Sequence, residues 1–255
     1  MSYDVSAVLQ VDHDGPVRIL RLNRPDHLNA TNHELHEQLT KVFPQIHEDF
    51  DARAVVLTGN GRAFSAGGDM AYIDEQIRDP DYRKLSLLHG KLIAAAMASC
   101  RVPIIAAVNG PAVGLGCSLV AMSDIVYMAR SAYLADPHVS VGLVAADGGA
   151  ISWPLMMSLH LAKEYALTGD RITAERAERI GLANHVVADD EVLDAALACA
   201  HRIAKQPRGA VEDTRRMLNH HLDRALNGSI DFALTAEFRS FDSPELRATV
   251  DRFLD

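Results

Sequence analysis

Short apolar segments that alternate with helix-forming patterns constrain the fold of this chain most strongly. Residues 54–57, 103–108 and 124–128 are rich in valine, isoleucine and alanine, and the first two end at Thr-Gly and Asn-Gly pairs. Apolar runs without polar alternation are typical of strands buried on both faces. Strands that alternate with helices predict an α/β fold.

Other patterns extend this series. Residues 17–22 alternate between apolar and polar side chains, which predicts a half-buried strand. An amphipathic helix with Pro44 inside it is predicted from apolar residues at helical spacing, and Thr31 and Glu34 are spaced as its capping box. The apolar residues of that helix are Leu35, Leu39, Val42, Ile46 and Phe50. Further helices are predicted at 70–78, 85–99, 114–122, 151–159 and 174–180, the last between Thr173 as N-cap and Gly181 as stop.

The chain is predicted to be helical from about residue 190 to its end. We therefore divide it into a core, residues 1–190, and a helical C-terminal region, residues 191–255, that we expect to serve oligomerisation.

Charge and cysteine content exclude several classes of protein. The 255 residues include 25 Lys+Arg and 34 Asp+Glu, a formal net charge of −9, and 48% are hydrophobic. This balance excludes a disordered chain and argues against a nucleic-acid partner, which would require an excess of cations. Three separated cysteines favour a reducing compartment, and no apolar run is long enough to span a bilayer. We expect a cytoplasmic location and no membrane partner.

Two glycine-rich loops, residues 63–69 and 109–117, carry the strongest functional signal. Each follows a predicted buried strand and precedes a predicted helix. Glycines let the backbone approach a ligand closely, and a helix N-terminus adds partial positive charge. Neither loop contains the dinucleotide fingerprint or the Lys-Ser/Thr of a phosphate loop. Together they could present two N–H groups to one oxygen, which is an oxyanion hole; alternatively, each is a tight structural turn.

An ordered set of segments resembles the enoyl-CoA hydratase/isomerase (crotonase) superfamily, from about Val17 to about Val187. The matching segments are Asn29-Ala30, residues 64–69, 103–110 and 114–116, Ser123-Asp124-Ile125, residues 167–170, and Ala177 through Gly181-Leu182. This resemblance implies a spiral of ββα units with a helical C-terminal region that builds homotrimers, often paired into hexamers. It also implies an acyl-CoA thioester substrate, with coenzyme A as part of the substrate and no separate cofactor.

The resemblance also implies particular site residues. The thioester carbonyl would lie between the backbone N–H groups of Ala66 and Leu115, which would stabilise an enolate. The coenzyme A moiety would be held by the loop and strand residues His27, Ala30, Ser65, Gly67, Gly68, Asp69 and Met70. His27 occupies a position where the family often has Lys or Arg, which weakens the expected phosphate contact.

The chain departs from the hydratase pattern at both catalytic glutamates. Ser118 and His138 occupy those two positions, so a two-glutamate hydration is not supported. We expect His138 to act as the base, since an imidazole titrates near neutral pH. Asp147 is a helix cap, or it orients His138, or it is itself a base or nucleophile. Ser118 is expected to hydrogen-bond substrate or water. No Cys/His cluster has metal-ligand spacing, so no metal is predicted.

Three functions remain open from the sequence. The first is an acyl-CoA hydratase, isomerase or related lyase that uses His138 and Asp147. The second is a C–C bond hydrolase of a cyclic β-diketone, because residues 137–154 resemble the β-diketone hydrolase branch (6-oxocamphor hydrolase) of the same superfamily. The third is a catalytically silent acyl-CoA binder.

Overall fold

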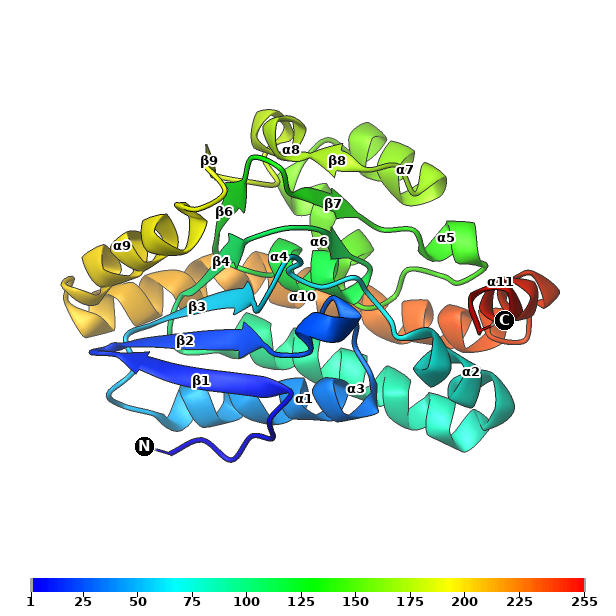
Figure 1. Ribbon diagram of the computed structural model, residues 1–255. Helices are drawn as coiled ribbons and strands as arrows, with labels where there is room; N and C mark the ends of the chain where they lie inside the picture. The colour runs from blue at the N-terminus through cyan, green and yellow to red at the C-terminus, as the bar shows by residue number, and fades with distance from the viewer. Residues whose placement is uncertain (1, 255) are drawn as a thin grey trace.

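A six-stranded sheet forms the centre of the molecule in the computed structural model, which describes residues 2–254 (Figure 1). Its strand order is β1-β2-β3-β4-β6-β9; β1 and β2 are antiparallel and all other neighbours are parallel. The strands are β1 (Leu9–Asp14), β2 (Val17–Leu22), β3 (Ala54–Gly59), β4 (Ile104–Val108), β6 (Ile125–Ala129) and β9 (His185–Val187). Strands β3 and β4 are buried along their whole length, which confirms the predicted strands at 54–57 and 103–108.

A second, three-stranded sheet brings the glycine-rich loops together. Its order is β5 (Ala112–Val113), β7 (Tyr133–Ala135) and β8 (Ile172–Thr173). An isolated parallel bridge joins Ser65, in the loop after β3, to Ala112 of β5. The first glycine-rich loop therefore runs beside the second.

Helices cover the central sheet and connect its strands. Helix α1 packs on α3, and α9 packs on β3, β4 and β6. The helices are α1 (His33–Glu48), α2 (Met70–Arg78), α3 (Pro80–Ser99), α4 (Leu115–Ala121), α5 (His138–Val141), α6 (Gly149–Met156), α7 (Leu159–Thr168), α8 (Ala174–Ile180), α9 (Val192–Ala204), α10 (Arg208–Ser240) and α11 (Pro244–Leu254), with a 3₁₀ turn η1 (Pro25–His27). None of these helices in residues 2–254 is both long and apolar enough to cross a membrane.

Helix boundaries correct several predictions. Helix α1 is capped by Asn32, whose side chain accepts from the Leu35 N–H, so the predicted Thr31–Glu34 capping box is wrong. Phe50 lies beyond the end of α1 and is 69% exposed, so it does not belong to the buried face of that helix. Helix α3 begins at Pro80 rather than near residue 85, because proline is well tolerated at the first helical position.

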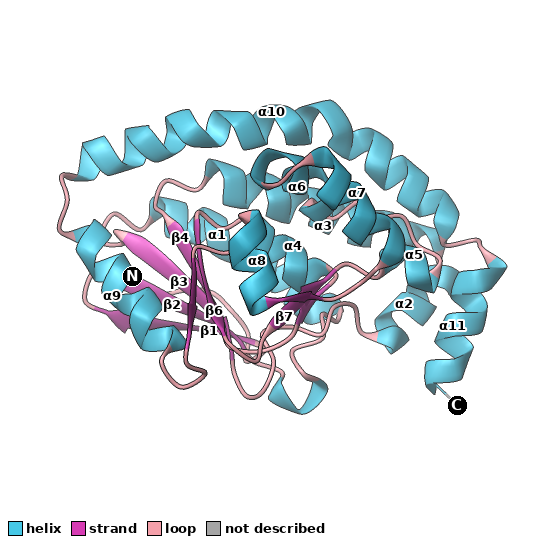
Figure 2. Cartoon of the chain, turned by 90° about the horizontal axis from the view of Figure 1, so that it is seen from above, coloured by secondary structure: helices cyan, strands magenta, loops and turns pink. Residues whose placement is uncertain are grey.

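The C-terminal region is helical, as predicted, but it shares the core of the rest of the chain. Val192, Ala196 and Ala200 of α9 belong to the same buried cluster as the central strands. Helix α10 packs on α3 and α6 and runs along one side of the molecule, as Figure 2 shows. Residue 190 therefore separates two parts of the chain, but not two hydrophobic cores.

Candidate active site

The two glycine-rich loops lie against each other at the entrance to a pocket. The Val113 N–H donates to the Ser65 carbonyl at 2.9 Å. Gly67 has a φ of +93°, and a Cβ there would lie 3.2 Å from the Val113 oxygen. A left-handed backbone this close to a neighbouring strand strongly favours glycine.

Two backbone N–H groups of these loops remain available on the pocket wall. The Ala66 N–H donates to the Leu28 carbonyl at 3.0 Å, so the prediction that it serves the oxyanion hole is wrong. Within residues 2–254, the Gly68 N–H makes no hydrogen bond. Leu115 is the first residue of α4, where a helical N–H lacks an intrahelical acceptor. Gly68 and Leu115 both line the pocket.

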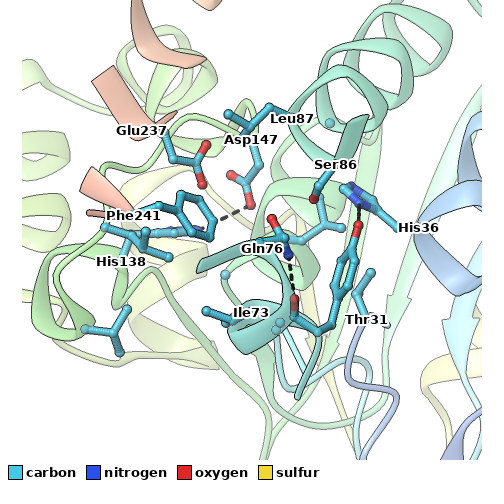
Figure 3. Close-up of a pocket in the computed structure, with 18 of the residues that line it drawn as sticks. Thr31, His36, Ile73, Gln76, Ser86, Leu87, His138, Asp147, Glu237 and Phe241 are labelled. Carbon is cyan, nitrogen blue, oxygen red and sulfur yellow. Dashed lines mark hydrogen bonds and ion pairs between the residues drawn. The ribbon is translucent and has the colours of Figure 1, made fainter. Parts of the chain in front are cut away.

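His138 is held between two carboxylates. Its Nδ1 is hydrogen-bonded to Asp136 Oδ1. Its Nε2 lies 3.8 Å from Asp147 Oδ2 (Figure 3). Asp136 follows β7 and is 1% exposed, while His138 opens α5. The sequence therefore places both residues at the end of one short strand, and the strand fixes the orientation of the ring.

Ser118 holds Asp147 rather than facing the pocket. The Ser118 Oγ donates to Asp147 Oδ1 at 2.5 Å and accepts from the Gly149 N–H at 3.1 Å. A Cβ at Gly149 would lie 2.5 Å from this oxygen, so only glycine permits the approach. Ser118 is 0% exposed and is not part of the pocket wall. The predicted contact of Ser118 with substrate is therefore wrong; Ser118 positions Asp147. Asp147 is also not a helix cap, because α6 begins after Gly148 without a side-chain cap.

A third carboxyl group, that of Glu237 of α10, completes the acidic end of the pocket. Glu237 is buried and lines the pocket with His138 and Asp147. Figure 3 shows the three side chains converging from α5, the loop before α6, and α10. The sequence offers no signal for Glu237, since α10 returns to the site only through the tertiary fold.

Burial and nearby charges shift the pKa values of His138 and of the carboxyl groups around it. Burial alone would lower the pKa of His138, but the negative charges of Asp136 and Asp147 outweigh it and raise that pKa to about 10. Burial opposes ionisation of Asp136, yet the adjacent imidazolium holds its pKa below the usual range. His138 is therefore protonated at neutral pH, the opposite of the resting base expected from the sequence.

The other two carboxyls shift upward. Burial raises the pKa of Asp147, although the His138 cation and the Ser118 hydrogen bond oppose it. Burial also raises the pKa of Glu237 to about 8, against the attraction of His138. Glu237 is therefore mainly protonated at pH 7, and the site combines a proton donor, His138, with a carboxyl of raised basicity, Asp147.

Of the residues expected to hold coenzyme A, some line the pocket and the others do not. Gly67, Gly68 and Met70 line the pocket. Ser65 is buried and donates to the Asn29 carbonyl, whereas the Asp69 side chain caps α2 and pairs with Arg24. His27 is exposed at the end of η1, and Ala30 lies in the loop after it. Their contact with coenzyme A remains a prediction.

One cluster has the composition of a metal site. Asp136, His138 and Asp147 each place one ligand atom within 4.8 Å of the others. The sequence did not predict a metal here. The hydrogen bond and the ion pair of His138 already account for this geometry, and no step is assigned to a metal.

Besides Glu237, two residues of this site, Asp136 and Gly68, were not predicted from the sequence. Asp136 stands two residues before His138 in the sequence Asp-Pro-His, a spacing that could have suggested a partner for the imidazole. Gly68 is two residues beyond the predicted donor Ala66. Only the hydrogen bond from the Ala66 N–H to Leu28 shows that Gly68, and not Ala66, has a backbone N–H available for a ligand.

The fold and the paired loops define the class of protein, and comparisons with known proteins agree. The family model described as enoyl-CoA hydratase/isomerase matches residues 13–255. The chain therefore belongs to the enoyl-CoA hydratase/isomerase family, and the predicted crotonase-type α/β fold is confirmed.

Individual relatives and solved structures resemble this chain over most of its length. The structure of an enoyl-CoA hydratase/isomerase from Mycobacterium paratuberculosis is 55% identical, with a TM-score of 0.96 over 98% of this chain and 100% of that one. A protein named as a probable enoyl-CoA hydratase, EchA12 of Mycobacterium bovis, is 37% identical over 230 residues, 87% of this chain and 80% of its own length. A β-diketone hydrolase from Anabaena, solved with (S)-3-oxocyclohexyl acetic acid, is 27% identical, with a TM-score of 0.86 over 92% of this chain and 94% of that one.

Proposed function

We propose that this chain processes an acyl-CoA thioester through an enolate that the N–H groups of Gly68 and Leu115 stabilise. The observation that carries the proposal is the pair of available N–H groups on the wall of the pocket that also contains His138 and Asp147. Fixed donors aimed at a developing oxyanion contribute about 3–4 kcal/mol each to transition-state stabilisation. The family membership supports a thioester as the source of that oxyanion.

Hydration of an enoyl thioester illustrates how the site would act. Asp147 removes a proton from water, the hydroxyl adds to the β-carbon, and the charge moves to the thioester oxygen. The His138 imidazolium then delivers its Nε2 proton to the α-carbon. Water has been added, Asp147 carries a proton and His138 lacks one. His138 Nε2 and Asp147 Oδ2 lie 3.8 Å apart, so the proton returns to His138 once a small side-chain movement brings the two atoms within hydrogen-bond distance. The same pair could move a proton between two carbons, which is isomerisation.

Turnover of crotonyl-CoA, followed by loss of the enoyl absorbance, tests the proposal. We expect turnover by the unaltered chain and a loss of about a hundredfold or more in kcat for Asp147→Asn and for His138→Ala. Asp170→Asn, an exposed carboxylate outside the pocket, serves as the matched control and should change nothing. Calorimetry with crotonyl-CoA should show binding by all variants. Binding without turnover by the unaltered chain would instead indicate a silent binder.

A second candidate is hydrolysis of a C–C bond in a cyclic β-diketone. The similarity to the Anabaena β-diketone hydrolase favours it. The probe is the bicyclic β-diketone that water would open to 3-oxocyclohexyl acetic acid. Release of that acid, together with no detectable binding of crotonyl-CoA by calorimetry, would replace the first proposal with this one.

A further inference from the structure

The end of the pocket opposite His138 is also polar. His36 of α1, Tyr72 of α2 and Ser86 of α3 meet there, and all three are buried. The Tyr72 hydroxyl lies 3.2 Å from His36 Nδ1 (Figure 3). Figure 3 shows Ile73 and Gln76 between this cluster and His138. The pocket therefore has two polar ends that different helices build.

The groups at this second end are neutral. Burial, with repulsion from His89 and His33, lowers the pKa of His36 to about 3, so its ring is uncharged. Burial also raises the pKa of the Tyr72 phenol, which keeps its proton. A neutral imidazole next to a phenol accepts the phenol proton at Nδ1 and keeps its own proton on Nε2.

Hydrogen-bonding capacity at this end exceeds what the chain uses. The Thr31 side chain, which also lines the pocket, makes no hydrogen bond to any other residue in the range 2–254. The Tyr72 oxygen donates to His36 and accepts from the Ser86 hydroxyl, so each of these two oxygens keeps at least one lone pair that can accept a further hydrogen bond. Buried polar groups are normally paired, so a ligand that supplies partners here is favoured over one that does not.

The charge of this end restricts the ligand further. None of the described residues that line the pocket is Lys or Arg. A carboxylate or phosphate buried here would lack a cation, and burial of an unpaired charge is strongly unfavourable. The matching chemistry is a neutral oxygen, either a carbonyl or a hydroxyl.

We propose that the cluster of His36, Tyr72, Ser86 and Thr31 binds a neutral oxygen of the substrate remote from the thioester. The substrate class is then an oxo- or hydroxy-acyl thioester rather than a plain alkyl one. This inference rests on the proposed acyl-CoA function. A plain alkyl chain would offer no hydrogen-bond partner to the polar groups at this end, and sites built to bind an oxygen discriminate strongly against analogues that lack it.

Calorimetry with matched thioesters tests the inference. The probes are hexanoyl-CoA and two oxohexanoyl-CoA compounds, one with a ketone at the fourth carbon of the acyl chain and one with a ketone at the fifth. We expect one oxo compound to bind the unaltered chain about tenfold more tightly than hexanoyl-CoA. Tyr72→Phe should bring that ratio toward one and leave hexanoyl-CoA binding intact. Ser86→Ala is the second variant if Tyr72→Phe does not fold, and it should reduce the ratio as well.

A matched tyrosine outside the pocket provides the control. Tyr133 of β7 faces Arg171, so Tyr133→Phe should keep the preference for the oxo compound. Equal affinity of all probes for the unaltered chain would overturn the inference. So would a Tyr72→Phe variant that weakens every probe alike, because that is the result of a purely structural role.

Failure of the acyl-CoA proposal would look different. No thioester would then bind, whatever its acyl group. The same comparison can be made with the bicyclic β-diketone and the bicyclic monoketone that lacks its second carbonyl. If the unaltered chain prefers the diketone and Tyr72→Phe loses that preference, the polar end still binds a neutral oxygen of the substrate. If the unaltered chain shows no preference, the inference about the polar end is overturned.

Discussion

Leu115 allows the backbone donor to be removed with little change to the fold. It is the first residue of α4, a position where proline fits because its missing N–H has no helical acceptor. The preceding Gly114 has φ 52° and ψ −122°, an extended mirror conformation that glycine can adopt before proline. We expect Leu115→Pro to lower kcat for crotonyl-CoA by about two to three orders of magnitude.

Leu115→Ala is the matched control for this experiment. It shortens the same side chain but keeps the N–H, so its kcat should stay within about tenfold of the unaltered enzyme. Equal losses in the proline and alanine variants would remove Leu115 from the oxyanion hole. Circular dichroism of both variants would establish that α4 and its surroundings are retained.

Residue roles were only partly predictable from the sequence. The resemblance to the enoyl-CoA hydratase/isomerase family pointed to His138 and Asp147, and the structure brings these two side chains to 3.8 Å from each other. The raised pKa of His138 could not be predicted, since it depends on the charges of Asp136 and Asp147 and on Glu237 from α10. The Ala66 N–H donates to the Leu28 carbonyl, whereas the Gly68 N–H is left available. No sequence pattern predicts which of the two N–H groups is available.

At the scale of elements, a buried ion pair joins β2 to the end of α1. Arg18 Nε lies 2.7 Å from Asp49 Oδ2, both side chains are 2% exposed, and the Tyr3 hydroxyl also donates to Asp49. Removal of one partner from a buried pair leaves the other charge uncompensated. We expect Asp49→Asn to lower the free energy of unfolding by about 3–5 kcal/mol in urea at pH 7.

An exposed pair on the same hairpin is the control for Asp49. Asp12 pairs with Arg21 but is 56% exposed, so Asp12→Asn should change the free energy of unfolding by less than about 1 kcal/mol. A similar small effect of Asp49→Asn would contradict the structural role assigned to the buried pair.

The pH dependence of Asp49 has a definite sign. Burial opposes its ionisation, but hydrogen bonds from Arg18 and Tyr3 outweigh burial and lower the pKa of Asp49 to about 2. This value is below that of an unfolded aspartate, about 3.9. The stabilisation is therefore present above about pH 4 and is lost as the pH falls through about 2. The difference between the unaltered chain and Asp49→Asn should shrink over that interval.

Whole elements were easier to predict than their ends. Helix α2 matches the predicted residues 70–78, because an apolar periodicity and Pro80 limit it. The start of α1 was missed, since Thr31 and Asn32 are both acceptable caps and only the backbone bridge of Thr31 to Gly68 decides between them. The pairing of β4 with β6, and of β6 with β9, depends on contacts between distant residues and was not assigned from the sequence.

For the whole molecule, exposed apolar side chains on α10 and α3 argue for self-association. On α10, Phe232 is 80% exposed, Met217 65% and Leu218 59%, while Leu88 and Leu92 of the adjacent α3 are also exposed. Large exposed apolar side chains on two adjacent helices are a feature of protein–protein interfaces. We predict that the chain sediments as a homotrimer, or as a hexamer of two trimers, at micromolar concentration.

Variants on this surface test the predicted assembly. Leu218→Gln combined with Phe232→Gln should shift the sedimenting mass toward that of one chain, 27.8 kDa. Leu167→Gln replaces an equally exposed leucine on α7, away from α10, and should leave the mass unchanged. A folded monomer for the unaltered chain would contradict the prediction. Because α10 also supplies Glu237 to the pocket, we expect dissociation to lower activity as well, since the helix that holds this carboxyl would lose its support.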